Sequence, residues 1–173
     1  GDIIRLIRSR NDYDVCITTG GASVGDYDLI GEVFERMGIE ILFDRVNMKP
    51  GMPVLAGVKD GILFIGLSGN PAAASIAFEQ VVRPVLLKMG GQKEWWRPVV
   101  RAKLAAGFHK GSESKRFVWA RMRQGEGCLL VEPLRWQGNG MLQSALHANA
   151  LIVIPANSPP LPVGTEVETM LLV

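Results

Sequence analysis

Over residues 2–89, short apolar runs alternate with longer amphipathic stretches, and this alternation limits the fold more than any other feature. Apolar residues recur at helical spacing in 2–9, 27–37 and 71–89. Short runs rich in Val, Ile and Leu, typical of buried strands, are 14–19, 39–46, 54–58 and 62–66. The alternation predicts an α/β domain in which helices cover both faces of a mainly parallel sheet.

Turn and cap residues punctuate these segments. Gly38 is placed to end the second helix as a C′ glycine. Asp60-Gly61, between two apolar runs, predicts a hairpin. Asn70 suits the N-cap of the third helix, Pro71 suits its first turn, and Pro84 should kink it.

The pattern changes at Gly90-Gly91, after which helical periodicity is nearly absent. The expected strands are 98–104, 116–123, 129–134, 150–155 and 165–173. They predict a second, small β domain, a barrel or sandwich. We therefore expect an α/β domain over 1–91, incomplete at its N-terminus, and a β-barrel domain over 92–173.

The composition is that of a globular protein, with 173 residues and 47% hydrophobic content. The net charge of +2 is too small to indicate a nucleic-acid partner. Apolar runs are too short for a membrane span. Two separated cysteines in apolar runs do not suggest a disulfide framework, which fits the cytoplasm. The chain opens without Met and within an amphipathic pattern, as if cut from a longer protein.

The first loop of chemical interest is 18–28, Thr-Thr-Gly-Gly-Ala-Ser-Val-Gly-Asp-Tyr-Asp, between a strand and a helix. Its glycines, Gly20, Gly21 and Gly25, would let the backbone approach a ligand, and Ser23 adds a hydroxyl. Asp26 and Asp28 beside an anion site would need a cation between them, which points to Mg²⁺. The alternative is a plain glycine-rich turn in which the aspartates cap the helix.

Two further loops carry polar groups. In the second, 47–53, prolines stiffen the chain around Lys49, which could bind an oxyanion or could simply be solvated. The third, 66–71, again joins a strand to a helix, as an anion site or as a plain capped connection. Because all three loops fall at element ends of one sheet, we predict that they surround one polar, anionic ligand.

Other candidates are weaker. His109 and His147 are far apart in sequence and lack the spacing of metal ligands. The basic stretch 110–116 is either a solvated loop or a segment whose Arg116 reaches an anion, since Arg suits bidentate oxyanion binding.

Taken together, the three loops resemble the signature of the molybdopterin molybdenumtransferase (MoeA) family, which is related to the E domain of gephyrin. The order and spacing of Thr18–Asp28, Lys49-Pro50-Gly51-Met52-Pro53 and Gly66–Ala74 both match. The likeness is strong over 14–91 and looser to the C-terminus, where 117–121 and 137–140 resemble the last domain of the family.

The resemblance implies that the protein inserts molybdate into adenylylated molybdopterin with release of AMP and help from Mg²⁺. Asp28 then matches an acidic position implicated in Mg²⁺ binding or catalysis, and Lys49 matches a lysine that attracts molybdate or phosphate. The ligand-binding positions implied are Gly20, Gly21, Ser23, Gly25, Pro50, Gly51, Ser68, Gly69, Asn70, Pro71 and Arg116. A homodimer and contacts with other molybdenum-cofactor proteins are also implied.

The chain departs from the family in two ways. Met52 stands where many relatives carry a second lysine. The chain also lacks the two N-terminal domains and the opening strand of the α/β domain, so we expect this piece not to be fully active alone. The alternatives are an enzyme related to molybdopterin adenylyltransferase or to CinA-like nucleotide hydrolases, and a non-catalytic pterin-binding scaffold module.

Overall fold

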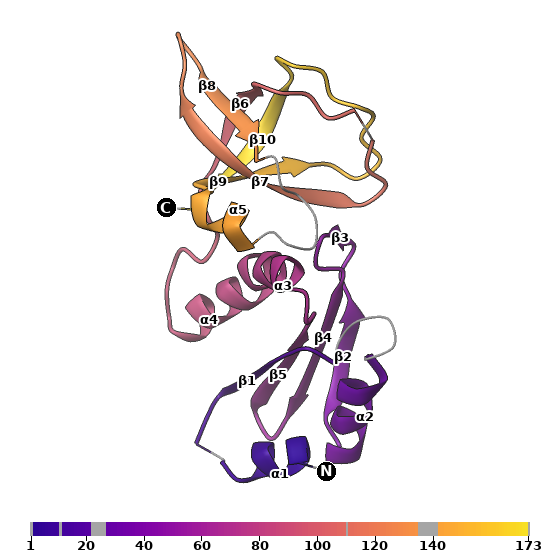
Figure 1. The fold of residues 1–173 in the computed structure, drawn as a ribbon. Coiled ribbons are helices and arrows are strands. Elements are labelled where there is room, and N and C mark those ends of the chain that lie inside the picture. The colour runs from indigo at the N-terminus through magenta and orange to yellow at the C-terminus, as the bar shows by residue number, and fades with distance from the viewer. Residues whose placement is uncertain (1, 11, 22–26, 110, 135–141, 173) are drawn as a thin grey trace. The chain divides into compact units, whose positions relative to one another are not determined.

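The computed structural model describes residues 2–10, 12–21, 27–109, 111–134 and 142–172 (Figure 1). The chain forms two compact units, which we treat separately. The first unit comprises residues 1–46 and 51–82, and the second comprises 47–50 and 83–173. The second division falls between Val82 and Arg83, within the helical segments over 71–89, whereas we expected a boundary after Gly91.

The first unit contains a four-stranded sheet. Its strand order is β1 (Val15–Thr19), β5 (Ile62–Leu67), β4 (Pro53–Lys59) and β2 (Glu40–Arg45). The α/β class is confirmed, but the expectation of a mainly parallel sheet was wrong. Within this sheet, among the described residues, β1 and β5 are the one parallel pair, whereas β5–β4 and β4–β2 are antiparallel. The tight turn at Asp60-Gly61, with φ of 51° and 79°, reverses the chain and makes β4 and β5 a hairpin.

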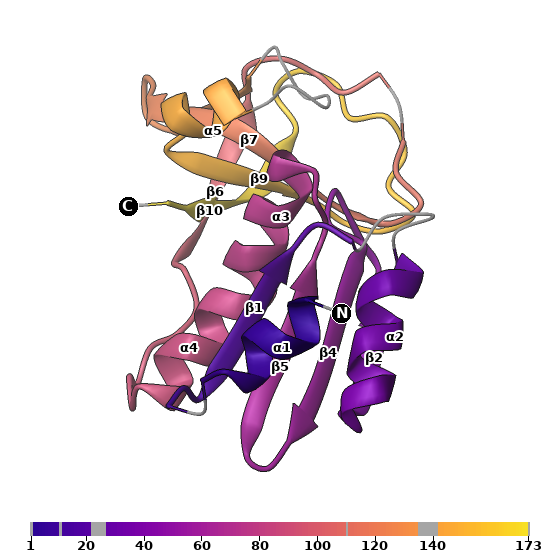
Figure 2. The ribbon, with the colours of Figure 1, turned by 60° about the horizontal axis from the view of Figure 1, so that its bottom comes forward.

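Helices α1 (Asp2–Arg8) and α2 (Tyr27–Met37) pack on one face of this sheet (Figure 2). The apolar face of α2 contributes Ile30, Val33, Phe34 and Met37 to that core, as its spacing predicts. The rings of Phe34 and Phe64 meet edge to face with centroids 5.8 Å apart. Alternate residues of β5, such as Ile65 and Leu67, are buried on the opposite face.

The predicted helix over 71–89 is divided into three helical segments. It begins as α3 (Pro71–Ala77), continues through a π-helical turn, η1 (Phe78–Val82), and ends as α4 (Arg83–Met89). Pro84 has no N–H to donate to the preceding turn, and the π turn lies just before it. Two residues of α4 contact Trp95, which follows the helix: Arg83 donates to the Trp95 carbonyl at 3.1 Å, and the Lys88 ammonium lies over the Trp95 ring.

The second unit is a five-stranded β-barrel, which confirms the predicted β domain. The strands are β6 (Val99–Leu104), β7 (Lys115–Gln124), β8 (Leu129–Pro133), β9 (Ala150–Ile154) and β10 (Glu166–Leu171). They pair in the order β7-β8-β6-β10-β9, and pairing of β9 with β7 closes the barrel. Its core includes Leu104, Val118, Val131 and Ile152.

Two elements of the second unit were not predicted. The short strand β3 (Met48–Lys49) pairs with the barrel strand β7 although its residues come from the middle of the α/β segment. The short helix α5 (Leu142–His147) lies in a region where we expected almost no helical periodicity. No helix in the described part of the chain is long and apolar enough to cross a membrane.

Candidate functional site

The first and third loops meet at one edge of the sheet. Strands β1 and β5 are parallel neighbours with Thr19 opposite Leu67, so both deliver their following loops to the same end. The backbone N–H of Gly20 donates to the Leu67 carbonyl at 3.1 Å. The structure therefore brings together two of the three loops that the sequence singled out.

Both loops depend on glycine for this approach. Gly20 and Gly21 have φ of 90° and 70°, which residues with a side chain rarely adopt. A Cβ placed on Gly69 would lie only 3.1 Å from the Gly20 Cα, so the two backbones are in direct contact. The contact leaves no room for a side chain between the loops at this point.

The polar residues of the third loop are mainly engaged with their own backbone. Asn70 is the N-cap of α3, as predicted, and its Oδ1 accepts from the N–H groups of Ala72 and Ala73 at 3.0 and 3.3 Å. Ser68 is buried, and its Oγ accepts from the Asn70 N–H at 3.2 Å. Pro71 takes the first helical turn. These contacts fix the shape of the loop, while ligand binding by Ser68, Gly69, Asn70 and Pro71 stays a prediction.

Thr18 adds a polar group that our list of binding residues did not include. Its Oγ1 is buried, and among the described residues it has no hydrogen-bond partner. A Cβ on Gly66, in the neighbouring strand, would lie 3.6 Å from this oxygen. The residue precedes the glycine pair at the carboxyl end of β1, and this position at a strand end was the available sequence signal. Buried hydroxyls normally have a partner, so a polar group placed beside Thr18 would satisfy its hydroxyl.

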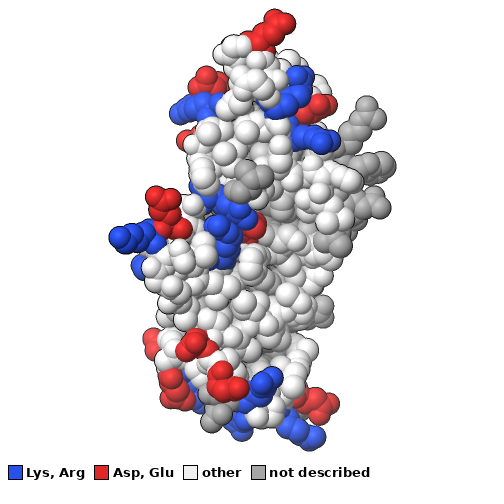
Figure 3. Space-filling view, turned by 90° about the vertical axis from the view of Figure 1, so that its left-hand side faces the viewer, with Lys and Arg blue, Asp and Glu red and all other residues white. Residues whose placement is uncertain are grey.

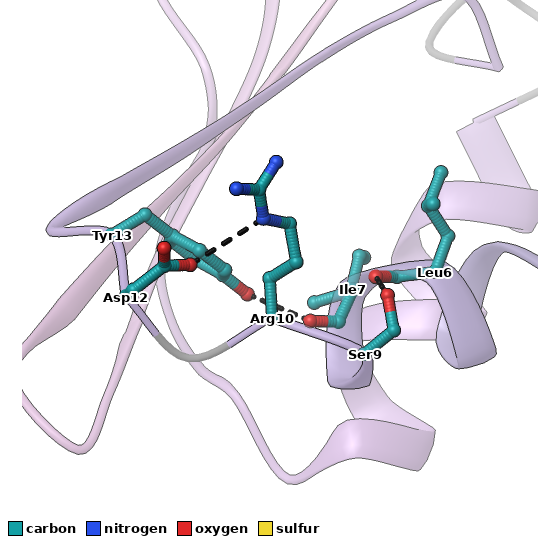
Figure 4. A network of polar contacts seen from close by, with 6 residues as sticks. All are labelled: Leu6, Ile7, Ser9, Arg10, Asp12 and Tyr13. Carbon is teal, nitrogen blue, oxygen red and sulfur yellow. Dashed lines mark hydrogen bonds and ion pairs between the residues drawn. The ribbon is translucent and has the colours of Figure 1, made fainter.

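A cavity of about 660 Å³ runs beside β1. Thr18, Thr19, Gly20 and Gly21 line its polar end, and mostly apolar residues of α1, β1 and α2 line the rest. Figure 4 shows the polar contacts of the segment between α1 and β1, whose Arg10 and Tyr13 also line the cavity. The Tyr13 hydroxyl donates to the Ile7 carbonyl at 3.1 Å, and Arg10 pairs with Asp12 at 3.4 Å.

Burial governs the two titratable groups of this region whose ionisation is shifted. It raises the pKa of Tyr13, with smaller contributions from Cys16 and Asp12. It also raises the pKa of the Cys16 thiol. Both groups are therefore held in their neutral, protonated forms at neutral pH, so they add no charge to the cavity.

Lys49 and Arg116 come together in the second unit. The parallel pairing of β3 with β7 sets Lys49 opposite Arg116 and Met48 opposite Lys115. Residues opposite each other in a parallel pair point to the same side of the sheet, with strands ~4.8 Å apart. Two cations that the sequence separates by more than sixty residues are thus neighbours. Lys49 is exposed and Arg116 is partly buried.

The ends of the second loop are tied in the first unit. The backbone N–H of Val46 donates to the Met52 carbonyl at 2.9 Å, which closes the chain around the loop. Gly51 has φ of 94°, a conformation suited to glycine. Pro50 belongs to the second unit, whereas Gly51 belongs to the first. The Met52 side chain is 42% exposed.

Several predicted site residues lie wholly or partly outside the described residues. Ser23 and Gly25 lie outside the described residues, as does Asp26. The backbone of Asp28 is placed in the first turn of α2, and its side chain lies outside the description. No cluster of three or more potential metal-ligating side chains exists in the described part of the chain. The metal role of Asp28, and the meeting of all three loops around one ligand, therefore stay predictions.

The surface carries no broad region of one charge sign on the face shown in Figure 3. Basic and acidic side chains lie interspersed there, with uncharged surface between them. This agrees with a net charge of +2 built from 19 basic and 17 acidic residues. On this face, an anion would be attracted by local groups and not by a broad basic region.

The fold defines a class of protein: an α/β domain with glycine-containing loops at the ends of two parallel strands, followed in the chain by a small β-barrel. Comparison with known families makes this specific. Residues 2–88 match the family described as a probable molybdopterin binding domain, and residues 101–172 match the MoeA C-terminal region, domain IV. The chain belongs to the MoeA family.

Individual relatives agree. The chain is 32% identical over 164 residues to a molybdopterin molybdenumtransferase of Staphylococcus epidermidis, a match that covers 95% of this chain and 39% of that protein. A Staphylococcus aureus protein of the same name is 33% identical over 159 residues, covering 92% and 38%. A molybdopterin biosynthesis MoeA protein from Pyrococcus horikosii superposes with a TM-score of 0.78 at 28% identity, covering 98% of this chain and 40% of that one. The chain thus spans about two fifths of the length of these relatives.

Proposed function

We propose that this protein takes part in molybdenum cofactor biosynthesis by inserting molybdate into adenylylated molybdopterin, with release of AMP. The family, the glycine loops at the strand ends and the paired cations support this proposal. In the working state we propose a homodimer that passes its product to other molybdenum-cofactor proteins, as the family resemblance implies. The ligands are a pterin nucleotide and the molybdate dianion, both of which need fixed positive charge or backbone donors.

The Lys49–Arg116 register is the observation that carries the proposal. Two like charges held side by side repel, and a dianion between them converts that repulsion into attraction. Arg116 can donate two parallel hydrogen bonds to a tetrahedral oxyanion, and Lys49 supplies a compact charge. Each charge-assisted hydrogen bond contributes about 1.5–3 kcal/mol, so losing either cation should weaken molybdate binding by about tenfold or more.

In the first unit the pterin-phosphate part of the substrate would lie at the first and third loops. The contact between Gly20 and Gly69 leaves backbone free of side chains there, and the buried Thr18 hydroxyl can satisfy a polar substrate group. Asp28, in the first turn of α2, would hold Mg²⁺ together with substrate oxygens. The Thr18 oxygen, which has no partner among the described residues, fits such an oxygen-rich site, and Mg²⁺ when bound would neutralise charge that develops on the phosphate.

The proposal is tested by molybdate-dependent AMP release from adenylylated molybdopterin. The parent protein is compared with Asp28→Ala and Lys49→Ala, and pterin binding is measured beside turnover. Asp28→Ala should lose turnover more than binding, because the Mg²⁺ that its carboxylate would hold neutralises the developing charge and does not bind the pterin itself. Lys49→Ala should raise the molybdate concentration needed for half-maximal release.

Two control variants match the test variants in charge: one removes a positive charge, as Lys49→Ala does, and the other removes a negative charge, as Asp28→Ala does. Lys93→Ala removes an exposed lysine, and Asp60→Asn replaces an exposed aspartate whose φ of 51° asparagine tolerates. Both should keep parental AMP release. Tight pterin binding without release in the parent would favour a scaffold module. Equal turnover of Asp28→Ala and the parent would refute the role given to Asp28.

A further inference from the structure

We propose that Met48 is a positioning residue that sets Lys49 in register with Arg116 for oxyanion binding. This inference rests on the proposed function, since it concerns how the molybdate site is assembled. It assigns a role to a residue of the second loop that carries no polar group.

The two residues of β3 have opposite environments. Met48 is 3% exposed, whereas the Lys49 beside it is exposed. Successive residues of a strand point to opposite sides, so a buried Met48 directs Lys49 to the other side. The buried Met48 side chain thus fixes the strand, whereas the exposed Lys49 side chain would contact the anion.

The partner strand shows the same division. Lys115, opposite Met48, has its ammonium 5.5 Å from the centre of the Phe117 ring, and Phe117 is buried. By strand alternation Lys115 and Phe117 share the side of Met48. Arg116, opposite Lys49, shares its side with Val118, which belongs to the barrel core. Met48 therefore lies on the side of β7 that carries the buried Phe117, and Lys49 lies on the side that carries Arg116.

A strand of only two residues has few backbone hydrogen bonds to fix its register. A slip of one residue would exchange the sides and move Lys49 away from Arg116. The slip would also move Met48 from its buried place to the exposed place that Lys49 now holds, and the cost of exposing this large apolar side chain opposes it. Met48 thus acts through Lys49, by holding the lysine in a conformation ready for the anion.

The test is calorimetric titration of sodium molybdate into the parent protein, Met48→Ala, Met48→Leu and Lys49→Ala, below the unfolding transition of each. We expect Met48→Ala to bind molybdate about tenfold more weakly, because preorganisation of the lysine is lost. Met48→Leu keeps the apolar volume and should stay within about twofold of the parent. If Met48→Ala does not fold, Met48→Val, which keeps a shorter apolar side chain, replaces it and should show a smaller loss in the same direction.

A double-mutant cycle separates positioning from general stability. If Met48 acts through Lys49, adding Met48→Ala to Lys49→Ala should weaken binding by no more than about twofold further. Met122→Ala, the same change in the far half of β7, should leave the affinity for molybdate within about twofold of the parent.

The outcomes separate the role of Met48 from the existence of the oxyanion site. An affinity loss in Lys49→Ala with none in Met48→Ala would overturn the role of Met48 and leave the proposed function standing. Equal losses from Met48→Ala with and without Lys49 would also overturn it. No molybdate binding by the parent, or no effect of Lys49→Ala, would overturn the oxyanion site itself and this inference with it.

Discussion

Replacing Gly69 by alanine is a direct test of the contact between the first and third loops. The new Cβ would lie 3.1 Å from the Gly20 Cα and 3.7 Å from its N. Both neighbours are backbone atoms, so they cannot swing aside as the end of a flexible side chain could. Overpacking of this kind costs about 1–3 kcal/mol, and we expect about 1–2 kcal/mol here because the loops are partly at the surface.

A matched control is Gly31→Ala in α2. A Cβ on Gly31 meets nothing within 4 Å, and alanine in a helix interior is favoured over glycine by about 0.5–1 kcal/mol. The same chemical change should therefore destabilise the first unit at Gly69 and stabilise it at Gly31.

Urea unfolding followed by two signals measures the effect. All four tryptophans, Trp95, Trp96, Trp119 and Trp136, belong to the second unit, so their fluorescence reports that unit, whereas far-UV circular dichroism also reports the helices of the first unit. We expect the circular dichroism midpoint of Gly69→Ala to fall by about 1 M, at a slope of about 1–2 kcal/mol per M. Equal midpoints for Gly69→Ala and the parent would refute the close contact of the two loops.

Three further predictions concern single side chains. Asn70→Ala should lower the free energy of unfolding by about 1 kcal/mol through loss of the α3 cap, and Asn70→Asp should lose much less in the same urea titration; equal effects would contradict the capping role. Arg116→Lys should weaken molybdate binding in calorimetry by about three- to tenfold, because lysine cannot form the bidentate contact, and full retention of affinity would show that only charge matters. In Cys128→Ser, Cys16 should react with iodoacetamide at pH 8 more slowly than glutathione, and its rate should still rise with pH where that of glutathione has levelled off, because burial raises the pKa of its thiol; a rate equal to that of glutathione would contradict the burial.

Much of the fold follows from local sequence signals. The spacing of apolar residues in 27–37 predicted α2, and Asp60-Gly61 predicted the hairpin, because both depend on neighbouring residues. The prediction of a mainly parallel sheet was wrong because the alternation of strands and helices indicates parallel pairing, whereas the turn at Asp60-Gly61 makes β4 and β5 antiparallel. An antiparallel pair is the necessary result of a two-residue turn.

The pairing of β3 with β7 could not be predicted from local sequence signals. β3 has only two residues, too few for any periodicity, and its partner β7 lies far along the chain. The sequence could name Lys49 and Arg116 separately but had no signal for their register. The touching loops at Gly20 and Gly69 were predicted because parallel strands deliver their ends to one edge.

The central claim is that Lys49 and Arg116 together hold an oxyanion. Anomalous diffraction at the molybdenum edge from crystals soaked in sodium molybdate tests it most directly. We predict one strong peak within hydrogen-bonding reach of both the Lys49 ammonium and the Arg116 guanidinium, and its loss in Lys49→Ala. A molybdenum peak elsewhere, with none between these two side chains, would contradict the claim.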